Sequence, residues 1–274
     1  MRTALLAAAA MLGFAANSLL SRAALRSDAI DAGSFVAIRL ATGALVLVLL
    51  VMARRERASG GSWPSAGALA VYALAFTFAY RELPAGTGAV ILFGAVQLTM
   101  IGVGIARGER PTPLQWIGWI CAVAGLVVVN APGIDPPPPR GAALMFVAGI
   151  AWGIYSLRGR GVQRPLATTA DNFLRTLPVA LALITISQVT GAHLTVRGIA
   201  LAAASGGLAS GLGYSLWYAV VPALGATRSA AVQLSVPVIT AASAIVLFAE
   251  PLRPTLAIGG GAIILGLALA LRSR

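Results

Sequence analysis

The sequence Tyr80-Arg81-Glu82-Leu83-Pro84 lies where one apolar segment of the chain ends and the next begins. A similar arrangement recurs in Tyr218-Ala219-Val220-Val221-Pro222, 138 positions further along the chain. In each copy a tyrosine ends one apolar segment, and a proline four residues later begins another. Because the same tyrosine–proline pattern occurs twice at a large spacing, the sequence predicts a two-fold internal repeat.

Further matched pairs support this repeat, at spacings that drift only from 136 to 141 residues. Such a drift is expected when loops differ in length between two copies of one unit. The pairs are Arg39 with Arg175, Glu109 with Glu250, Pro113 with Pro254, Gly118 with Gly259, and Gly125 with Gly266.

The composition predicts a polytopic membrane protein. Hydrophobic residues make up 58% of the chain and charged residues 10%, with a mean hydropathy of +0.88, whereas soluble domains carry about 25% charged residues. The net charge of +12 comes entirely from arginines. Most lie in short gaps between apolar segments, which is typical of membrane topology, and we therefore expect no nucleic-acid partner. The single Cys121 excludes a disulfide framework and a cysteine metal site, and we expect no metal or cofactor.

A membrane-spanning helix needs about 20 mainly apolar residues. The short gaps favour an all-α helix bundle over a barrel, and the first segment is interpreted as a span because it lacks a convincing cleavage site. Ten segments fit: 3–22, 32–53, 64–81, 84–106, 112–131, 141–158, 168–190, 197–219, 223–249 and 251–271.

The arginines predict the orientation of these spans. With the N-terminus inside, 12 arginines fall in cytoplasmic segments and 6 on the opposite side. This bias favours a protein of a bacterial-type cytoplasmic (inner) membrane with both termini in the cytoplasm.

A proline-rich linker, residues 132–140, divides the chain into a first repeat, 1–131, and a second repeat, 141–274. Each half holds five predicted spans. Because five is odd, two such units in series face opposite ways across the membrane. Inverted repeats around a central cavity are the architecture of alternating-access transporters, which bind substrate between the repeats.

The sequence resembles the drug/metabolite transporter superfamily, and within it the EamA-like ten-helix exporters. The resemblance rests on Gly108–Pro113 and Ala249–Pro254, on the arginine in each second span, on the tyrosine that closes each third span, and on Pro237. The first half has Val96 where the second has Pro237, which departs from the pattern. The aromatic amino acid exporters are the branch it resembles most. The resemblance implies a cavity lined by the first, third, fourth, sixth, eighth and ninth spans, with the fifth and tenth at the periphery.

Two kinds of side chain are candidates for substrate binding. Aromatic residues at membrane depth suit an apolar or aromatic substrate, and buried amides and hydroxyls suit its polar groups. For both kinds the alternative is ordinary helix packing or hydrogen bonding between helices. The candidates are Asn17, Tyr72, Phe76, Phe93, Gln97, Trp152, Tyr155, Tyr214, Gln233 and Ser235.

Other residues are assigned to gating, to structure or to the membrane interface. The predicted gating and hinge residues are Tyr80, Pro84, Tyr218, Pro222 and Pro237. Arg39, Arg175, Glu109 and Glu250 are predicted to be structural. Either arginine could bind a substrate carboxylate, but their duplication and their place near helix entrances favour structure, and Asp171 is spaced to pair with Arg175. Trp63, Trp116, Trp119 and Trp217 are assigned to the interfacial belt.

The predicted function is an exporter or facilitator of amino acids, aromatic or otherwise hydrophobic, or threonine and methionine. We expect a monomer whose partners are the small-molecule substrate and the lipid bilayer. An exchanger of nucleotide sugars or organic phosphates is the alternative, followed by a drug efflux carrier. An enzyme is disfavoured, because acidic residues do not cluster and His193 lies in a loop. No carboxylate falls in mid-span, which favours passage down the substrate gradient without an obligatory proton.

Overall fold

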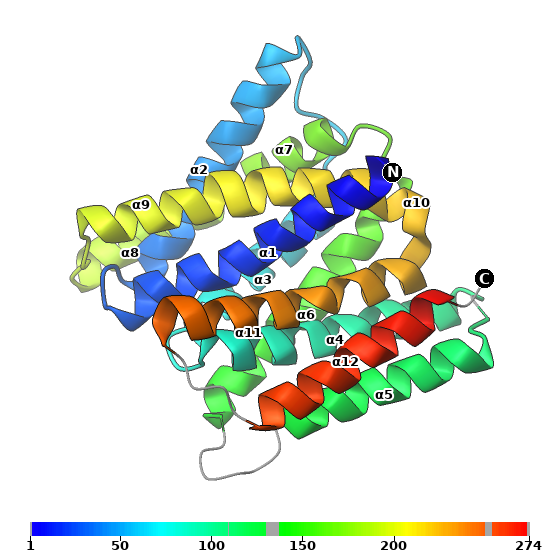
Figure 1. Ribbon diagram of the computed structural model, residues 1–274. Helices are drawn as coiled ribbons and strands as arrows, with labels where there is room; N and C mark the ends of the chain where they lie inside the picture. The colour runs from blue at the N-terminus through cyan, green and yellow to red at the C-terminus, as the bar shows by residue number, and fades with distance from the viewer. Residues whose placement is uncertain (1, 109, 130–136, 250–253, 273–274) are drawn as a thin grey trace.

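The computed structural model describes residues 2–108, 110–129, 137–249 and 254–272, and these form helices with no strand among them (Figure 1). One isolated bridge joins Ile30 to Leu194. The helices are α1 (Arg2–Arg26), α2 (Ala32–Ala53), α3 (Trp63–Ala79), α4 (Ala85–Ala106), α5 (Pro113–Val129), α6 (Pro139–Arg158), α7 (Pro165–Arg175), α8 (Leu177–Thr190), α9 (Val196–Ala204), α10 (Gly213–Gln233), α11 (Ser235–Phe248) and α12 (Pro254–Arg272). A short 3-10 turn, η1 (Gly159–Gly161), and a π-helix, η2 (Ser205–Leu212), complete the order.

Seven helical stretches among the described residues are long and apolar enough to cross a membrane. They confirm the predicted class, an all-α polytopic membrane protein. The helices α3, α5 and α12 occupy the other three predicted ranges, and the ten-span count stays a prediction. The seven are Arg2–Arg26, Ala32–Ala53, Ala85–Ala106, Pro139–Gly161, Pro165–Thr190, Val196–Gly225 and Arg228–Phe248.

The predicted boundary at Pro222 is wrong. Pro84 does precede a new helix, as the N-cap of α4, but Pro222 lies inside α10. The helix is interrupted three residues later, where Gly225 adopts φ 72° and ψ 178°. That conformation is open to glycine at little steric cost, so the glycine places the break. The seventh predicted span is also divided, into α7 and α8.

The first helix of each half packs against the other half. The α6 helix lies mainly against α3 and α4, whereas α1 lies against η2, α10 and α11. In Figure 1, α1 and α11 run side by side, and α5 and α12 form a pair along one edge of the molecule. The peripheral place that the resemblance implied for the fifth and tenth spans is therefore confirmed.

Glycines form the close interface between α5 and α12. A side chain at Gly125 would collide with the carbonyl oxygen of Gly259, and one at Gly266 with that of Gly118. Small residues at such crossings let helix backbones approach closely within a membrane. Gly125 corresponds to Gly266 in the other repeat, and Gly259 corresponds to Gly118. The contact of Gly125 with Gly259 is therefore equivalent to that of Gly266 with Gly118.

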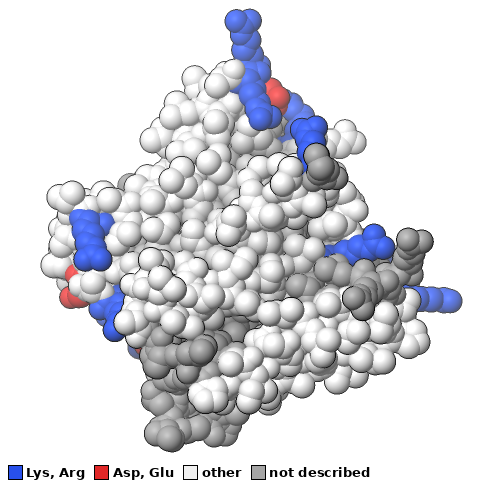
Figure 2. Space-filling model, in the orientation of Figure 1, with Lys and Arg blue, Asp and Glu red and all other residues white. Residues whose placement is uncertain are grey.

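Charged side chains gather at the margins of the molecule, and the middle of the face in Figure 2 shows almost none. Arg164 pairs with Glu56 at 2.7 Å, and Arg140 approaches Glu82 at 3.7 Å. Each pair joins two segments that the predicted topology places on the same side of the membrane.

The start of α2 is held by Asp31. Its carboxylate accepts hydrogen bonds from the Ser34 backbone N–H and the Ser187 hydroxyl, each at 2.9 Å. Burial raises the pKa of the Asp31 carboxyl, but the hydrogen bonds from Ser34, Ser187 and the His193 backbone outweigh it and hold that pKa below its usual 3.8. The ionised form therefore stabilises the fold.

We expect Asp31→Asn to lower the free energy of unfolding by about 0.3–1 kcal/mol near neutral pH, because the charge at the helix N-terminus is lost. Since the folded pKa is depressed, this advantage of the parent protein exists above pH 3.8 and disappears as the pH falls below it. Thermal unfolding in detergent at pH 6 and pH 3 measures it. Asp28→Asn, at an exposed position of the same loop, is the control. An equal difference at both pH values would contradict the assignment.

Candidate substrate-binding site

A buried hydrogen-bonded network lies where α1, α3 and α10 meet. The Asn17 amide donates to the Tyr72 hydroxyl at 3.1 Å, and the Tyr214 hydroxyl donates to that of Tyr72 at 3.2 Å. The Asn17 carbonyl oxygen accepts a bond of 2.6 Å from the Ser205 hydroxyl. The network thus joins the first half of the chain to the second through polar side chains that are nearly inaccessible to solvent.

Arg39 belongs to the same network. Its side chain is 1% exposed, and it donates to Ser210 Oγ at 3.0 Å and to the Tyr214 hydroxyl at 2.7 Å. The guanidinium carbon lies 5.3 Å from the centre of the Tyr72 ring. The prediction that Arg39 lies near a helix entrance is wrong, because it is the eighth residue of α2, about 10 Å along the axis.

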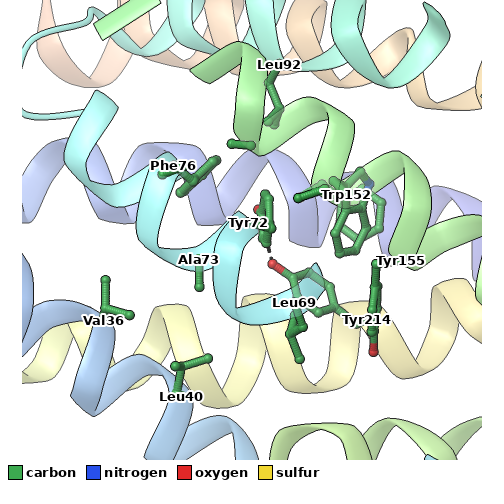
Figure 3. Close-up of a cluster of buried hydrophobic side chains, with 14 of the residues drawn as sticks. Val36, Leu40, Leu69, Tyr72, Ala73, Phe76, Leu92, Trp152, Tyr155 and Tyr214 are labelled. Carbon is green, nitrogen blue, oxygen red and sulfur yellow. Dashed lines mark hydrogen bonds between the residues drawn. The ribbon is translucent and has the colours of Figure 1, made fainter. Parts of the chain in front are cut away.

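Aromatic rings pack around the hydrogen bond between Tyr72 and Tyr214 (Figure 3). The ring centre of Trp152 lies 4.5 Å from that of Tyr214 and 5.0 Å from that of Tyr72. Phe14 packs edge-on against Trp152 at 5.1 Å, an arrangement that aromatic pairs favour. We name Asn17, Arg39, Tyr72, Trp152 and Tyr214 the central cluster.

The π-helix η2 brings two serines of the second half to the central cluster. Hydrogen bonds from residue i to i+5 bring side chains five apart onto one face, and here Ser205 reaches Asn17 while Ser210 reaches Arg39. Gly206 lies so close to α2 that a side chain would collide with the Arg39 carbonyl oxygen. Short π-helical segments are frequent at functional sites.

The two predicted glutamines form separate buried hydrogen bonds outside this network. The Gln233 side-chain oxygen accepts a bond of 2.6 Å from the indole N–H of Trp152. Gln97 donates from Nε2 to the Ala230 carbonyl oxygen, and its Oε1 is buried without a hydrogen-bond partner. Gln97 therefore links helices of opposite halves, and Gln233 does so through Nε2, which donates to the sulfur of Met100 at 3.3 Å. The packing alternative allows both contacts as well.

The two repeated tyrosines each contact the first helix of their own half. The Arg22 guanidinium of α1 donates to the Tyr80 carbonyl oxygen at 3.1 Å. The Tyr218 hydroxyl donates to the Tyr155 carbonyl oxygen of α6 at 2.9 Å, and the two rings stack at 4.8 Å. Tyr80 and Tyr218 are fully buried, so both contacts are closed in this structure.

Several predicted residues stay outside the central cluster. Ser235 bonds to the Val232 carbonyl oxygen of the preceding turn, and Arg175 pairs with Asp171 at 3.2 Å, the spacing the sequence predicted. Pro237 lines a cavity of about 270 Å³ between α4, α11 and α12. Phe76 and Phe93 are buried in the core around the cluster. Glu109 and Glu250 lie outside the described residues.

The sequence did not single out three contributors to this core. Phe14 lay in an apolar segment with no distinguishing neighbour, and Ser210 depends on the π-helix for its position. Trp217, assigned to the interfacial belt, is fully buried and donates to Ser156 at 3.1 Å. Its distance of 5.7 Å from Phe14 marks it as part of the core instead. Trp119, also assigned to the belt, is buried as well, whereas Trp63 and Trp116 are exposed as predicted.

The predicted central cavity is filled in this structure. The members of the central cluster are each no more than 4% exposed, and their rings pack in direct contact. A groove of about 590 Å³ lies instead between α2 and α8, lined entirely by apolar side chains. Access of any molecule to this cluster requires its side chains to move apart.

The fold and the site define a multi-pass helical membrane protein with a buried polar and aromatic site between its two halves. A model of the EamA-like transporter family matches residues 1–131 and 139–272. The chain belongs to the EamA-like transporter family, and the resemblance inferred from the sequence is confirmed.

Three proteins are similar to this chain in sequence, and two of them are described as transporters. An uncharacterized protein of Pseudomonas aeruginosa is 50% identical over 275 residues, covering 100% of this chain and 96% of that protein. The uncharacterized inner membrane transporter YedA of Escherichia coli is 28% identical over 132 residues, 48% of this chain and 41% of its own length. An uncharacterized transporter of Archaeoglobus fulgidus is 25% identical, covering 84% of both chains.

A crystal structure of another protein has the same fold. It aligns with a TM-score of 0.74 and 20% identity, over 97% of this chain and 99% of that one. At this identity the likeness describes the architecture alone.

Proposed function

We propose that this protein moves amino acids, aromatic or otherwise hydrophobic, across the membrane by alternating access. The observation that carries the proposal is the central cluster. It combines rings that suit an apolar side chain with amides and hydroxyls that suit a substrate's polar groups, and it lies where the two halves meet. Transporter sites of this kind lie at the interface between repeats.

The packing supports ten spans arranged as two inverted repeats. The contacts Gly125–Gly259 and Gly118–Gly266 exchange with each other under the repeat correspondence. The way α6 packs on α3 and α4 likewise corresponds to the way α1 packs on the helices of the second half. Both features are those expected of a pseudo-two-fold axis lying in the membrane plane.

The contacts of Tyr80 and Tyr218 act in this proposal as equivalent gates at opposite faces. Tyr80 holds α3 to α1, and Tyr218 holds α10 to α6. Opening one while the other stays closed would expose the central cluster to one side at a time. In the predicted topology Tyr80 faces outside and Tyr218 inside. The proposal places both termini in the cytoplasm and the protein in the inner membrane, as YedA's description supports.

Crosslinking tests this gate. In a Cys121→Ser background, Arg22→Cys with Arg81→Cys places thiols on α1 and beside Tyr80. A short bifunctional thiol reagent is expected to abolish transport, and reduction to restore it, because the outer gate cannot open. Arg158→Cys with Ser62→Cys is the matched control, since Arg158 bonds to Ser62 within the packed α6–α3 group. Transport that continues through the first crosslink would contradict the gating role.

Transport by the purified protein in liposomes tests the function itself. Labelled phenylalanine and threonine are supplied with and without a pH gradient. Uptake is expected to follow the substrate gradient and to ignore pH, because no acidic side chain among the described residues is buried in the core. Uptake that requires the pH gradient would contradict the absence of proton coupling. No uptake of either amino acid would remove the substrate assignment.

A nucleotide-sugar or organic-phosphate exchanger fits less well. Such ligands carry two or more negative charges and favour several cationic side chains in the site. Arg39 is the one buried charged residue in the described part of the chain.

A further inference from the structure

We propose that Arg39 binds the carboxylate of the substrate through the Nη1 atom of its guanidinium group, which has no hydrogen-bond partner among the described residues. This inference deepens the proposed function and rests on it. It changes the role of Arg39 from the structural one that the sequence favoured to that of an anion-binding group.

Arg39 is a buried cation whose charge is balanced by no described carboxylate. Its hydrogen-bond partners, Ser210 and Tyr214, offer neutral hydroxyls. The Nη1 atom is buried and has no hydrogen-bond partner. Removing one partner of a buried ion pair is strongly destabilising, because a lone buried charge lacks solvation. A site with an unpaired buried positive charge is therefore suited to a ligand that carries a negative charge.

Other arginines differ from Arg39 in pairing with carboxylates. The arginines that pair with carboxylates in the described residues are Arg140, Arg164 and Arg175, and each is exposed or partly exposed. Those pairs lie at helix ends, where water screens them and their contribution is small. The buried Arg39 is instead hydrogen-bonded to hydroxyl groups. A guanidinium group presents two parallel N–H donors that match the two oxygens of a carboxylate.

The surroundings of Arg39 suit a small carboxylate with an apolar body. The Phe76 and Tyr72 rings lie 5.0 and 5.3 Å from its guanidinium carbon, and so keep water away from it. Tyr72 and Tyr214 in turn contact Trp152, so the apolar part of a bound ligand would meet the tryptophan. Neutral hydroxyl groups can be exchanged for a carboxylate at little cost when the rings separate, since the carboxylate forms the stronger bond.

A purely structural role makes a different prediction. If Arg39 only ties α2 to η2 and α10, its replacement changes stability but leaves the preference among ligands unaltered. Ligand discrimination therefore separates the two roles. The probes are phenylalanine, phenylalaninamide, which lacks the carboxylate, and phenylacetate, which lacks the amine.

The experiment measures binding of these three probes to purified, folded protein by tryptophan fluorescence and by thermal shift. The parent protein is expected to bind phenylalanine and phenylacetate at least tenfold more tightly than phenylalaninamide. Arg39→Gln is expected to remove this preference, and Arg39→Lys to keep part of it. Arg175→Gln is the matched control, because Arg175 is partly exposed and pairs with Asp171. This variant is expected to show the same preference among the three probes as the parent protein.

Two results would overturn the proposal. The first is a parent protein that binds phenylalaninamide as tightly as phenylalanine, which needs no variant to fold. The second is a folded Arg39→Gln protein that keeps the parent's preference.

The inference and the proposed function fail separately. Binding of phenylacetate that depends on Arg39, without transport of any amino acid, would uphold the anion site and overturn the amino acid assignment. Transport of phenylalanine in which the carboxylate makes no difference would uphold the transporter and overturn the role of Arg39.

Discussion

Replacing Trp152 with alanine is expected to lower amino acid transport at least tenfold and to reduce the free energy of unfolding by about 3–5 kcal/mol. The indole ring is 2% exposed and touches Phe14, Tyr72 and Tyr214. Its N–H also bonds to Gln233. Alanine would leave a cavity between the halves, and the side-chain oxygen of Gln233 would lose its hydrogen-bond donor. Initial uptake rates in liposomes and thermal unfolding in detergent measure the two effects.

Two controls separate packing from binding. Trp116→Ala removes a tryptophan that is 46% exposed, and is expected to leave both quantities nearly unchanged. Trp152→Phe keeps an aromatic ring and removes the bond to Gln233, so it is expected to recover much of the stability and less of the transport. Full transport by Trp152→Ala would show that the central cluster does not bind the substrate.

Leucine at Gly125 is expected to prevent α5 and α12 from packing and to lower the yield of folded protein several-fold. Overpacking of a tight interface costs about 1–3 kcal/mol or more, and here the collision is with a backbone carbonyl that cannot turn aside. Gly266→Leu is expected to have an effect of similar size, because its contact with Gly118 corresponds to that of Gly125 with Gly259. Size-exclusion chromatography and thermal unfolding measure the loss.

Gly260→Leu is the matched control for this pair. It lies in α12, as Gly266 does, and apart from the backbone of its own helix no described atom lies within 4 Å of the position that a side chain would take. We expect it to fold as the parent does. If Gly125→Leu and Gly266→Leu differ widely in their effects, the two-fold correspondence between the halves is not reflected in the packing.

The sequence predicted much of the candidate site because membrane depth limits which residues are informative. Amides and tyrosines in otherwise apolar segments have to find partners, so Asn17, Tyr72 and Tyr214 could be singled out without coordinates. Arg39 was identified as costly and assigned a structural role, whereas the anion-binding role proposed above rests on contacts that only the structure shows. The role of Arg39 depends on which groups surround it. These groups come from α3, η2 and α10, which are distant from Arg39 in the sequence.

Local backbone geometry was harder to predict from the sequence. The π-helix η2 and the break at Gly225 depend on how closely α2 and the neighbouring helices approach. Pro222 looked like a helix start, since proline favours the first turn, yet the chain continues its helix past it. Tertiary contacts override such local preferences when burial compensates for a lost hydrogen bond.

By itself the sequence determined the class of this protein, the approximate positions of its helical segments and its family. These follow from composition, from apolar length and from duplicated residue order, all of which are properties of segments. The tertiary structure alone decided which side chains share the centre. It packs α6 against the first half and α1 against the second, places a π-helix against α2, and surrounds Arg39 with hydroxyls and, among the described residues, no carboxylate. Such a juxtaposition arises from helices far apart in the chain, and no local pattern encodes it.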